Sequence, residues 1–268
     1  MLVLPSTSFA QCGGVFAVQP KHHPRGQIPP LAIGDSTMLL ALYDLAAAGY
    51  NANAHGCRQY GEALALLGGR RAAHTLPHMT VIALGADGSV TRGDIEQTLR
   101  ILGPGRLLVL VTPRELGGGS GPDAATEREE ARAHTKRIRL LDWVKYSAGH
   151  GAWFQPDGVH LTTAGAQAFT EFLKQALKWA YPPPNTTLRT ATITSAAGTA
   201  VFRFTGSGAV SGFQCRLSGT LRQTKSFRTC GSPRRYEHLK PGKYVFEARA
   251  VGPGGPDPTP VSKAFTIS

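Results

Sequence analysis

The sequence predicts an α/β domain followed by a small all-β domain. Residues 28–181 alternate short apolar runs with stretches of helical length, which is typical of a parallel sheet covered by helices. After three consecutive prolines the chain changes to short alternating strands separated by Gly, Pro and Ser, as in a β-sandwich. We therefore expect an N-terminal arm (1–27), a three-layer α/β/α sandwich with a parallel sheet (28–181), a Pro-rich linker (182–187) and an all-β domain (188–268).

The apolar runs of the first domain have the length of buried strands. They lie at 31–33, 80–84, 107–111 and 138–142, with a weaker candidate at 51–54. The helices expected between and after them lie at 37–48, 58–67, 92–102, 123–136 and 169–180, and glycines follow several of them. Because the carboxyl ends of parallel strands meet at one edge of a sheet, the loops that follow these strands should gather there.

A serine, a histidine and a carboxylate occur in two of these loops. Ser36 ends the triplet Gly34-Asp35-Ser36 after the first strand, where backbone N–H groups and the positive end of the next helix would face developing negative charge. Asp157 precedes His160 by three residues, so its carboxylate can hold Nδ1–H while Nε2 faces a serine. Each motif alone is ordinary, but together they predict a serine esterase with Ser36 as nucleophile, His160 as base and Asp157 as the orienting carboxylate.

Four segments within residues 28–180 resemble the SGNH hydrolase family, also called GDSL-type esterases, and especially the SGNH domains of bacterial cell-surface proteins, some of which are fused to membrane acyltransferases. The segments are Gly34-Asp35-Ser36, 53–58, 81–88 and 157–162. The resemblance implies an SGNH, flavodoxin-like fold without a cofactor, and an oxyanion hole built from Ser36, Gly56 and the residue at position 87. It also implies short acyl groups on carbohydrate or cell-envelope polymers as substrates. Whether water or a second alcohol resolves the acyl-enzyme, making an esterase or an O-acyltransferase, stays open.

The third segment departs from the family pattern at Asp87, where the family normally has an Asn whose amide donates to the oxyanion. An ionised carboxylate only accepts hydrogen bonds and would repel the oxyanion. Three accounts are open: Asp87 carries a proton, another donor such as Arg58 or Gln59 replaces it, or catalysis is weak or absent. The rival hypothesis is a non-catalytic protein that binds envelope polysaccharide on an SGNH scaffold. Trp143, Trp153 and Phe154 could stack on sugars, although packing is the expected role of at least two of them.

Other polar residues of the first domain receive structural interpretations. Asp142 ends a strand and is expected to be a structural or loop-capping carboxylate, with a catalytic role as the alternative. His22-His23 and the His55-x-Cys57 pair lack a full ligand set, so we expect no metal. The glycine run 117–121 lacks the Lys-Ser/Thr of a phosphate loop and is expected to be a mobile loop that could act as a lid.

The all-β domain resembles the bacterial Ig-like or fibronectin-like modules of extracellular proteins. The resemblance lies at 213–217, 230–233, 239–242 and 257–260, among strands expected at 192–194, 200–204, 212–217, 243–250 and 263–267.

The four cysteines predict an exported protein. Cys215 and Cys230 can pair within the second domain, which leaves Cys12 and Cys57 for the first; four free thiols in a cytosolic protein are the alternative. Residues 1–10 end in a small-x-small pattern but lack the charged start and apolar core of an export signal. No stretch approaches the roughly twenty apolar residues of a membrane span. We expect a secreted or cell-surface bacterial protein.

The positive charge concentrates in the second domain. The whole chain carries a formal charge of +12, and residues 185–268 hold twelve Lys and Arg against three Asp and Glu. This balance favours contact with an anionic polymer or cell surface, or serves solubility alone. Nucleic-acid binding is not expected, because no recognition helix or stacking motif accompanies the charge.

Overall fold

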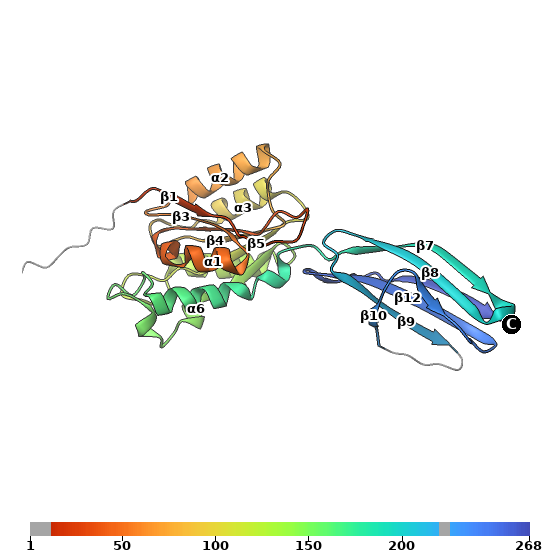
Figure 1. Cartoon of the computed structure of the whole chain (residues 1–268). Helices are drawn as coiled ribbons and strands as arrows, with labels where there is room; N and C mark the ends of the chain where they lie inside the picture. The colour runs from red at the N-terminus through yellow and green to blue at the C-terminus, as the bar shows by residue number, and fades with distance from the viewer. Residues whose placement is uncertain (1–11, 220–225) are drawn as a thin grey trace, which may run out of the picture. The chain divides into compact units, whose positions relative to one another are not determined.

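The computed structural model describes residues 12–219 and 226–268, in two compact units (Figure 1). The first unit contains the chain up to His23 and Gln27–Ala180, and the second contains Pro24–Gly26 and Tyr181–Ser268.

A six-stranded sheet forms the centre of the first unit, in the order β1-β3-β2-β4-β5-β6. Five strands run parallel, as predicted: β2 (Leu31–Gly34), β3 (Asn51–His55), β4 (Met79–Ala83), β5 (Leu107–Val111) and β6 (Ile138–Leu141). The prediction of a wholly parallel sheet is wrong, because β1 (Val15–Val18) pairs antiparallel with β3. This edge strand comes from the region expected to be an arm. Its four residues are all apolar, but Val15 and Phe16 stay more than half exposed, as on the edge of a sheet.

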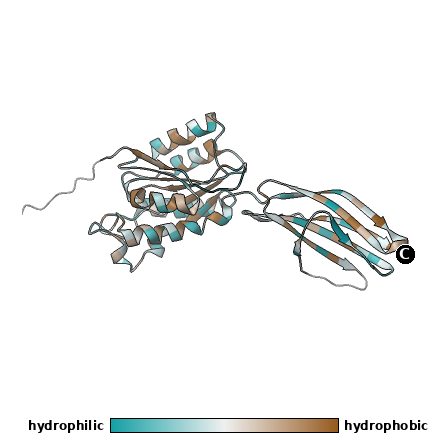
Figure 2. Ribbon diagram, in the orientation of Figure 1, coloured by the Kyte–Doolittle hydropathy of each residue, from teal (hydrophilic) through white to brown (hydrophobic). Residues whose placement is uncertain are grey.

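Helices cover both faces of this sheet (Figure 1). Contacts link α2 to α3 and α3 to α4 on one face, and α1 to α6 on the other. Their bounds are α1 Leu42–Ala48, α2 Tyr60–Ala72, α3 Arg92–Leu102, α4 Pro122–Ala133, the short α5 Trp143–Tyr146, and α6 Thr163–Lys174. In Figure 2 the helices carry both hydrophobic and hydrophilic residues, as expected for helices with one face on a sheet.

Four of the five predicted helices have different ends in the structure; α4 ends at Ala133, three residues before the predicted end. The first begins as a 3₁₀ helix over Ser36–Ala41 before α1. The second continues through Gly68 and Gly69 to Ala72, where Arg71 donates to two carbonyls at the end of α3. The last begins six residues early, because the hydroxyl of Thr162 accepts the N–H of Gly165 and caps α6, and it ends at Lys174 instead of residue 180.

The second unit is all-β, as predicted, with two sheets around one apolar core. One sheet contains β7 (Asn185–Thr194), β8 (Thr199–Ser207) and β11 (Arg234–Tyr236). The other contains β9 (Gly212–Gly219), β10 (Arg228–Cys230), β12 (Gly242–Gly252), β13 (Gly255–Pro256) and β14 (Val261–Ile267). The stacked rings of Phe202 and Phe246, 3.9 Å apart, join the sheets. β7 begins inside the predicted linker, and the short β10, β11 and β13 were not predicted. The all-β architecture is observed, and the more specific resemblance to Ig-like or fibronectin-like modules stays a prediction.

Candidate active site

The nucleophile turn follows directly from the end of β2. A Cβ on Gly34 would lie 2.5 Å from the Cβ of Met38, so only glycine allows the chain to turn this tightly. Asp35 then caps the 3₁₀ helix: its Oδ1 accepts the N–H of Thr37 at 3.0 Å and the Thr37 hydroxyl at 2.7 Å. Ser36 is thereby placed at the carboxyl edge of the sheet.

Asp35 also ties this turn to the loop after β4. Its Oδ2 accepts the N–H of Ala86 at 3.2 Å, next to Asp87. Burial of the Asp35 carboxyl raises its pKa, although the hydrogen bonds from Thr37 and Ala86 oppose that rise. Asp35 therefore acts as a structural link between the first and third motif segments.

The turn before α6 holds the base and its carboxylate. Asp157 Oδ1 accepts the backbone N–H groups of Val159 and His160, each at 2.9 Å, while Oδ2 lies 2.7 Å from His160 Nδ1. Partial burial alone would raise the pKa of Asp157, but these hydrogen bonds outweigh it and the pKa is lowered. An ionised Asp157 accepts Nδ1–H, which leaves Nε2 as the acceptor.

The structure brings Ser36, His160 and Asp157 into one hydrogen-bonded chain. Ser36 Oγ lies 2.9 Å from His160 Nε2, across 124 positions of sequence. Both links fall within the reach required for a nucleophile, its base and an orienting carboxylate.

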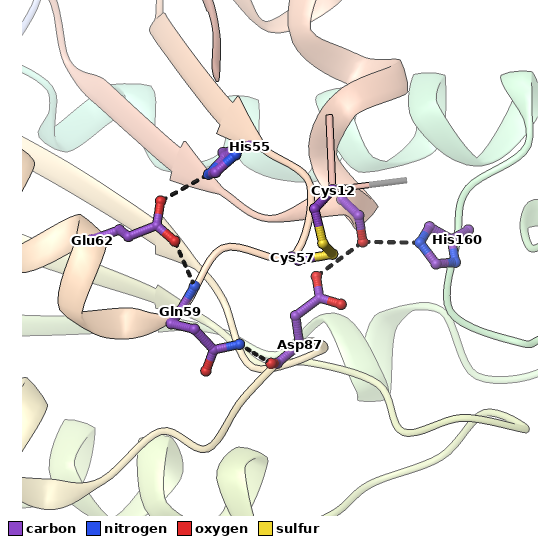
Figure 3. Close-up of a disulfide and its surroundings, with 8 residues drawn as sticks. Cys12, His55, Cys57, Gln59, Glu62, Asp87 and His160 are labelled. Atoms are coloured by element: carbon purple, nitrogen blue, oxygen red, sulfur yellow. Dashed lines mark hydrogen bonds and ion pairs between the residues drawn. A yellow bond between two sulfur atoms is a disulfide. The ribbon is translucent and has the colours of Figure 1, made fainter. Parts of the chain in front are cut away.

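Asp87 contacts the same hydroxyl. Ser36 Oγ lies 3.1 Å from Asp87 Oδ2 and is oriented to donate to it. A serine hydroxyl has one proton, so an ionised Asp87 and the Nε2 of His160 compete for it. Figure 3 shows Asp87 and His160 in the surroundings of the Cys12–Cys57 disulfide.

Arg58 and Gln59, the two possible replacements for the oxyanion donor at position 87, form hydrogen bonds with other groups. Buried Arg58 donates from Nη1 to the carbonyls of Gly34 and Asn53, and from Nη2 to the Asn53 side chain. The Gln59 amide donates to the backbone carbonyl of Asp87 (Figure 3). Both side chains therefore shape the loops around Ser36, with their amide and guanidinium groups directed at other acceptors.

Comparisons with known proteins agree with this architecture. No protein-family model matches the chain. The chain is 32% identical over 152 residues to YrhL of Bacillus subtilis (55% of this chain, 23% of that protein). It is 28% identical over 149 residues to the peptidoglycan O-acetyltransferase OatA of Listeria monocytogenes (55% and 24%). The match thus spans about a quarter of the length of each relative.

A solved structure covers the same region. The C-terminal catalytic domain of Streptococcus pneumoniae peptidoglycan O-acetyltransferase A superposes with a TM-score of 0.50 at 25% identity, over 57% of this chain and 94% of that domain. The first unit has an SGNH hydrolase-like fold.

Two disulfides form as predicted, and one belongs to the SGNH-like unit. Cys12 pairs with Cys57, and Cys215 pairs with Cys230. Cys57 directly follows Gly56 and has a left-handed backbone, with φ of 57°. The disulfide therefore anchors the loop that carries the predicted oxyanion donor Gly56. It also removes Cys57 as a metal ligand, and no cluster of three or more metal-binding side chains occurs among the described residues.

A second loop of the SGNH-like unit braces the base turn. The N–H of Gly117 donates to the Asp157 carbonyl at 2.7 Å, and Arg114 Nε donates to the Gly158 carbonyl at 2.9 Å. A Cβ on Gly158 would meet the backbone of Gly117 at 2.7 Å. The predicted mobile glycine loop is thus attached at its start to the turn that holds the base. Arg114 was missed because a lone arginine after a strand gives no motif.

The remaining candidates have structural roles. Asp142 caps α5 and binds Arg128 through both of its oxygens at 2.9 Å, as its structural interpretation predicted. Trp143 and Phe154 are buried and pack together, with ring centroids 5.9 Å apart. These two rings are therefore not presented to a sugar, whereas Trp153 is only partly buried and stacks on the His150 ring at 3.9 Å.

Proposed function

We propose that the SGNH-like unit is a serine-dependent O-acyltransferase that moves an acetyl group to a hydroxyl of cell-envelope peptidoglycan. The observation that carries the proposal is the hydrogen-bonded chain from Ser36 through His160 to Asp157, at 2.9 and 2.7 Å. The names of the relatives supply the acyl group and the acceptor polymer.

The first half of the proposed reaction makes an acyl-enzyme. Ser36 Oγ attacks the carbonyl carbon of an acetyl ester while His160 Nε2 takes the hydroxyl proton and Asp157 stabilises the imidazolium. Backbone N–H groups of Ser36 and Gly56 would stabilise the oxyanion. Collapse of the tetrahedral intermediate breaks the bond to the leaving alcohol, which receives the proton from His160.

The second half transfers the acetyl group. A glycan hydroxyl gives its proton to His160 Nε2 and attacks the acyl carbon, and the Ser36 ester bond breaks as Oγ regains a proton. The predicted serine esterase shares the first half, with water as the acceptor in the second. The relatives are named as acetyltransferases, so they favour the glycan over water.

The test uses an activated ester and a sugar acceptor. Purified protein is given p-nitrophenyl acetate with and without a chito-oligosaccharide, and released nitrophenol and acetylated sugar are measured by absorbance and mass spectrometry. We expect acetylated sugar with the wild type and none with Ser36→Ala. Hydrolysis without sugar acetylation would make the protein an esterase, and equal turnover by both proteins would leave only the non-catalytic binding hypothesis.

The proposed reaction belongs outside the cytoplasm. The two disulfides join cysteines whose Cα atoms lie 5.2 and 5.8 Å apart. Disulfide bonds persist in oxidising compartments. Peptidoglycan, the polymer in the relatives' names, is part of the cell envelope. No described helix has the length and apolarity needed to cross the bilayer.

A further inference from the structure

The second unit has a groove at the open side of its two sheets. Its walls come from β10, at the edge of one sheet, and β11, at the edge of the other, which three residues connect in sequence. The groove has a volume of about 380 Å³, which is within the range of small-ligand sites.

Two arginines occupy core-facing positions along this groove. Arg228 pairs in register with Cys215, and Arg234 pairs with Phe202. Directly opposed side chains of antiparallel strands lie on the same face, and Cys215 and Phe202 are both buried in the core. Positions that would normally hold apolar residues thus present two exposed guanidinium groups to the space between the sheets.

In the part of the second unit that the structure describes, no Asp or Glu side chain pairs with these two cations. Its three acidic residues all have other partners: Glu237 binds Arg235 at 2.9 Å, Glu247 binds Arg216 at 2.8 Å, and Asp257 accepts backbone N–H groups of Thr186 and Thr259.

The two groove arginines differ from the paired ones in their surroundings. Among the described residues, the Arg228 side chain has no ion-pair or hydrogen-bond partner, and Arg234 lies over the Tyr236 ring at 5.0 Å. Guanidinium groups match carboxylates in a bidentate geometry, so the groove is complementary to a carboxylate held beside an aromatic ring.

We propose that this groove binds a carboxylate of a peptidoglycan peptide stem. The choice of peptidoglycan rests on the proposed function, since it is the polymer that the catalytic unit would modify. Guanidinium groups bind phosphate as well as carboxylate, and the carboxylate is chosen because the peptide stems of the polymer that the catalytic unit would modify carry it. The second unit would thereby hold the polymer while the SGNH-like unit acetylates it, which raises the effective concentration of the acceptor.

The experiment is a pelleting assay with the full chain and insoluble peptidoglycan stripped of its phosphate polymers. We expect Arg228→Gln and Arg234→Gln each to weaken binding about tenfold or more. Arg203→Gln is the matched control, because Arg203 is an exposed arginine on β8 without a partner among the described residues. We expect it to bind like the wild type.

Three results would overturn the proposal: no binding of the wild type, an equal loss with Arg203→Gln, or binding only to walls that retain phosphate polymers. Failure of this groove proposal can be distinguished from failure of the proposed acyltransferase function. Ser36→Ala should pellet like the wild type, and the groove variants should hydrolyse p-nitrophenyl acetate at the wild-type rate.

Discussion

Asp87→Asn should accelerate the chemistry at Ser36. In the structure the Ser36 hydroxyl lies 3.1 Å from Asp87 Oδ2 and 2.9 Å from His160 Nε2. An ionised Asp87 competes with His160 for the single hydroxyl proton and places a negative charge beside the site where the oxyanion develops. The Asn amide has nearly the same shape as the Asp carboxylate, but it carries no charge and can donate an N–H.

The size of this effect follows from the distance. A carboxylate about 4 Å from the oxyanion, at an effective dielectric constant of about 20, opposes it by about 4 kcal/mol, which corresponds to about 10³ in rate. Loss of one oxyanion donor typically costs about 10²–10³. Because the two effects act on the same oxygen and are not additive, we expect kcat/KM to rise by about 10²–10³.

Steady-state hydrolysis of p-nitrophenyl acetate measures this change, with Asp87→Ala as the matched control. Alanine removes the charge without supplying a donor, so its rate should lie between those of the wild type and Asn. A fall in kcat/KM for Asn would refute the reasoning and show that the Asp87 carboxylate assists the reaction. Equal rates for Ala and Asn would show that the charge alone matters.

Three further predictions concern the base, the disulfide and a buried acid. Asp157→Asn should lower kcat by about 10³–10⁴, because the amide cannot hold the Nδ1–H tautomer; unchanged kcat would exclude Asp157 from the triad. Cys12→Ser should lower the free energy of unfolding by up to about 4 kcal/mol, because the lost disulfide closes a loop of 45 residues. Denaturant titration measures this change, and an unchanged free energy of unfolding would contradict the prediction. Fully buried Glu127 has no hydrogen-bond partner for its carboxyl, and burial raises its pKa well above 4.5. The folded state therefore keeps a proton that the unfolded chain loses, and wild-type stability should fall by up to about 1.4 kcal/mol per pH unit between pH 4.5 and the raised pKa of the folded state. Glu127→Gln should remove this pH dependence of the free energy of unfolding, and the same pH dependence in the variant and the wild type would contradict the prediction.

The sequence predicts the catalytic side of the sheet better than its edges. The central strands are short apolar runs because both of their faces are buried, so hydrophobicity alone locates them. The parallel order of these strands then places Ser36 and His160 together at the carboxyl ends of the strands, although the sequence gives no distance between them. Edge strands bury less: β1 is mostly exposed, and β10 and β11 carry arginines where the pattern would require apolar residues. β10 and β11 therefore resemble loops in sequence, and β1, although apolar throughout, lies in the region expected to be an arm, so the mixed sheet and the basic groove emerge only from the structure.

The partners of Asp87 could not be predicted for a different reason. Its carbonyl receives the Gln59 amide, and its neighbour Ala86 donates to Asp35. These contacts join three loops that are separated by 24 to 51 positions, so they depend on how the strand ends converge rather than on local pattern. Both restrain the backbone of the Asp87 loop while leaving its carboxylate to Ser36. The carboxylate is therefore held at the nucleophile by the same framework that would hold an asparagine there, and changing that one side chain is a direct test of what its charge does.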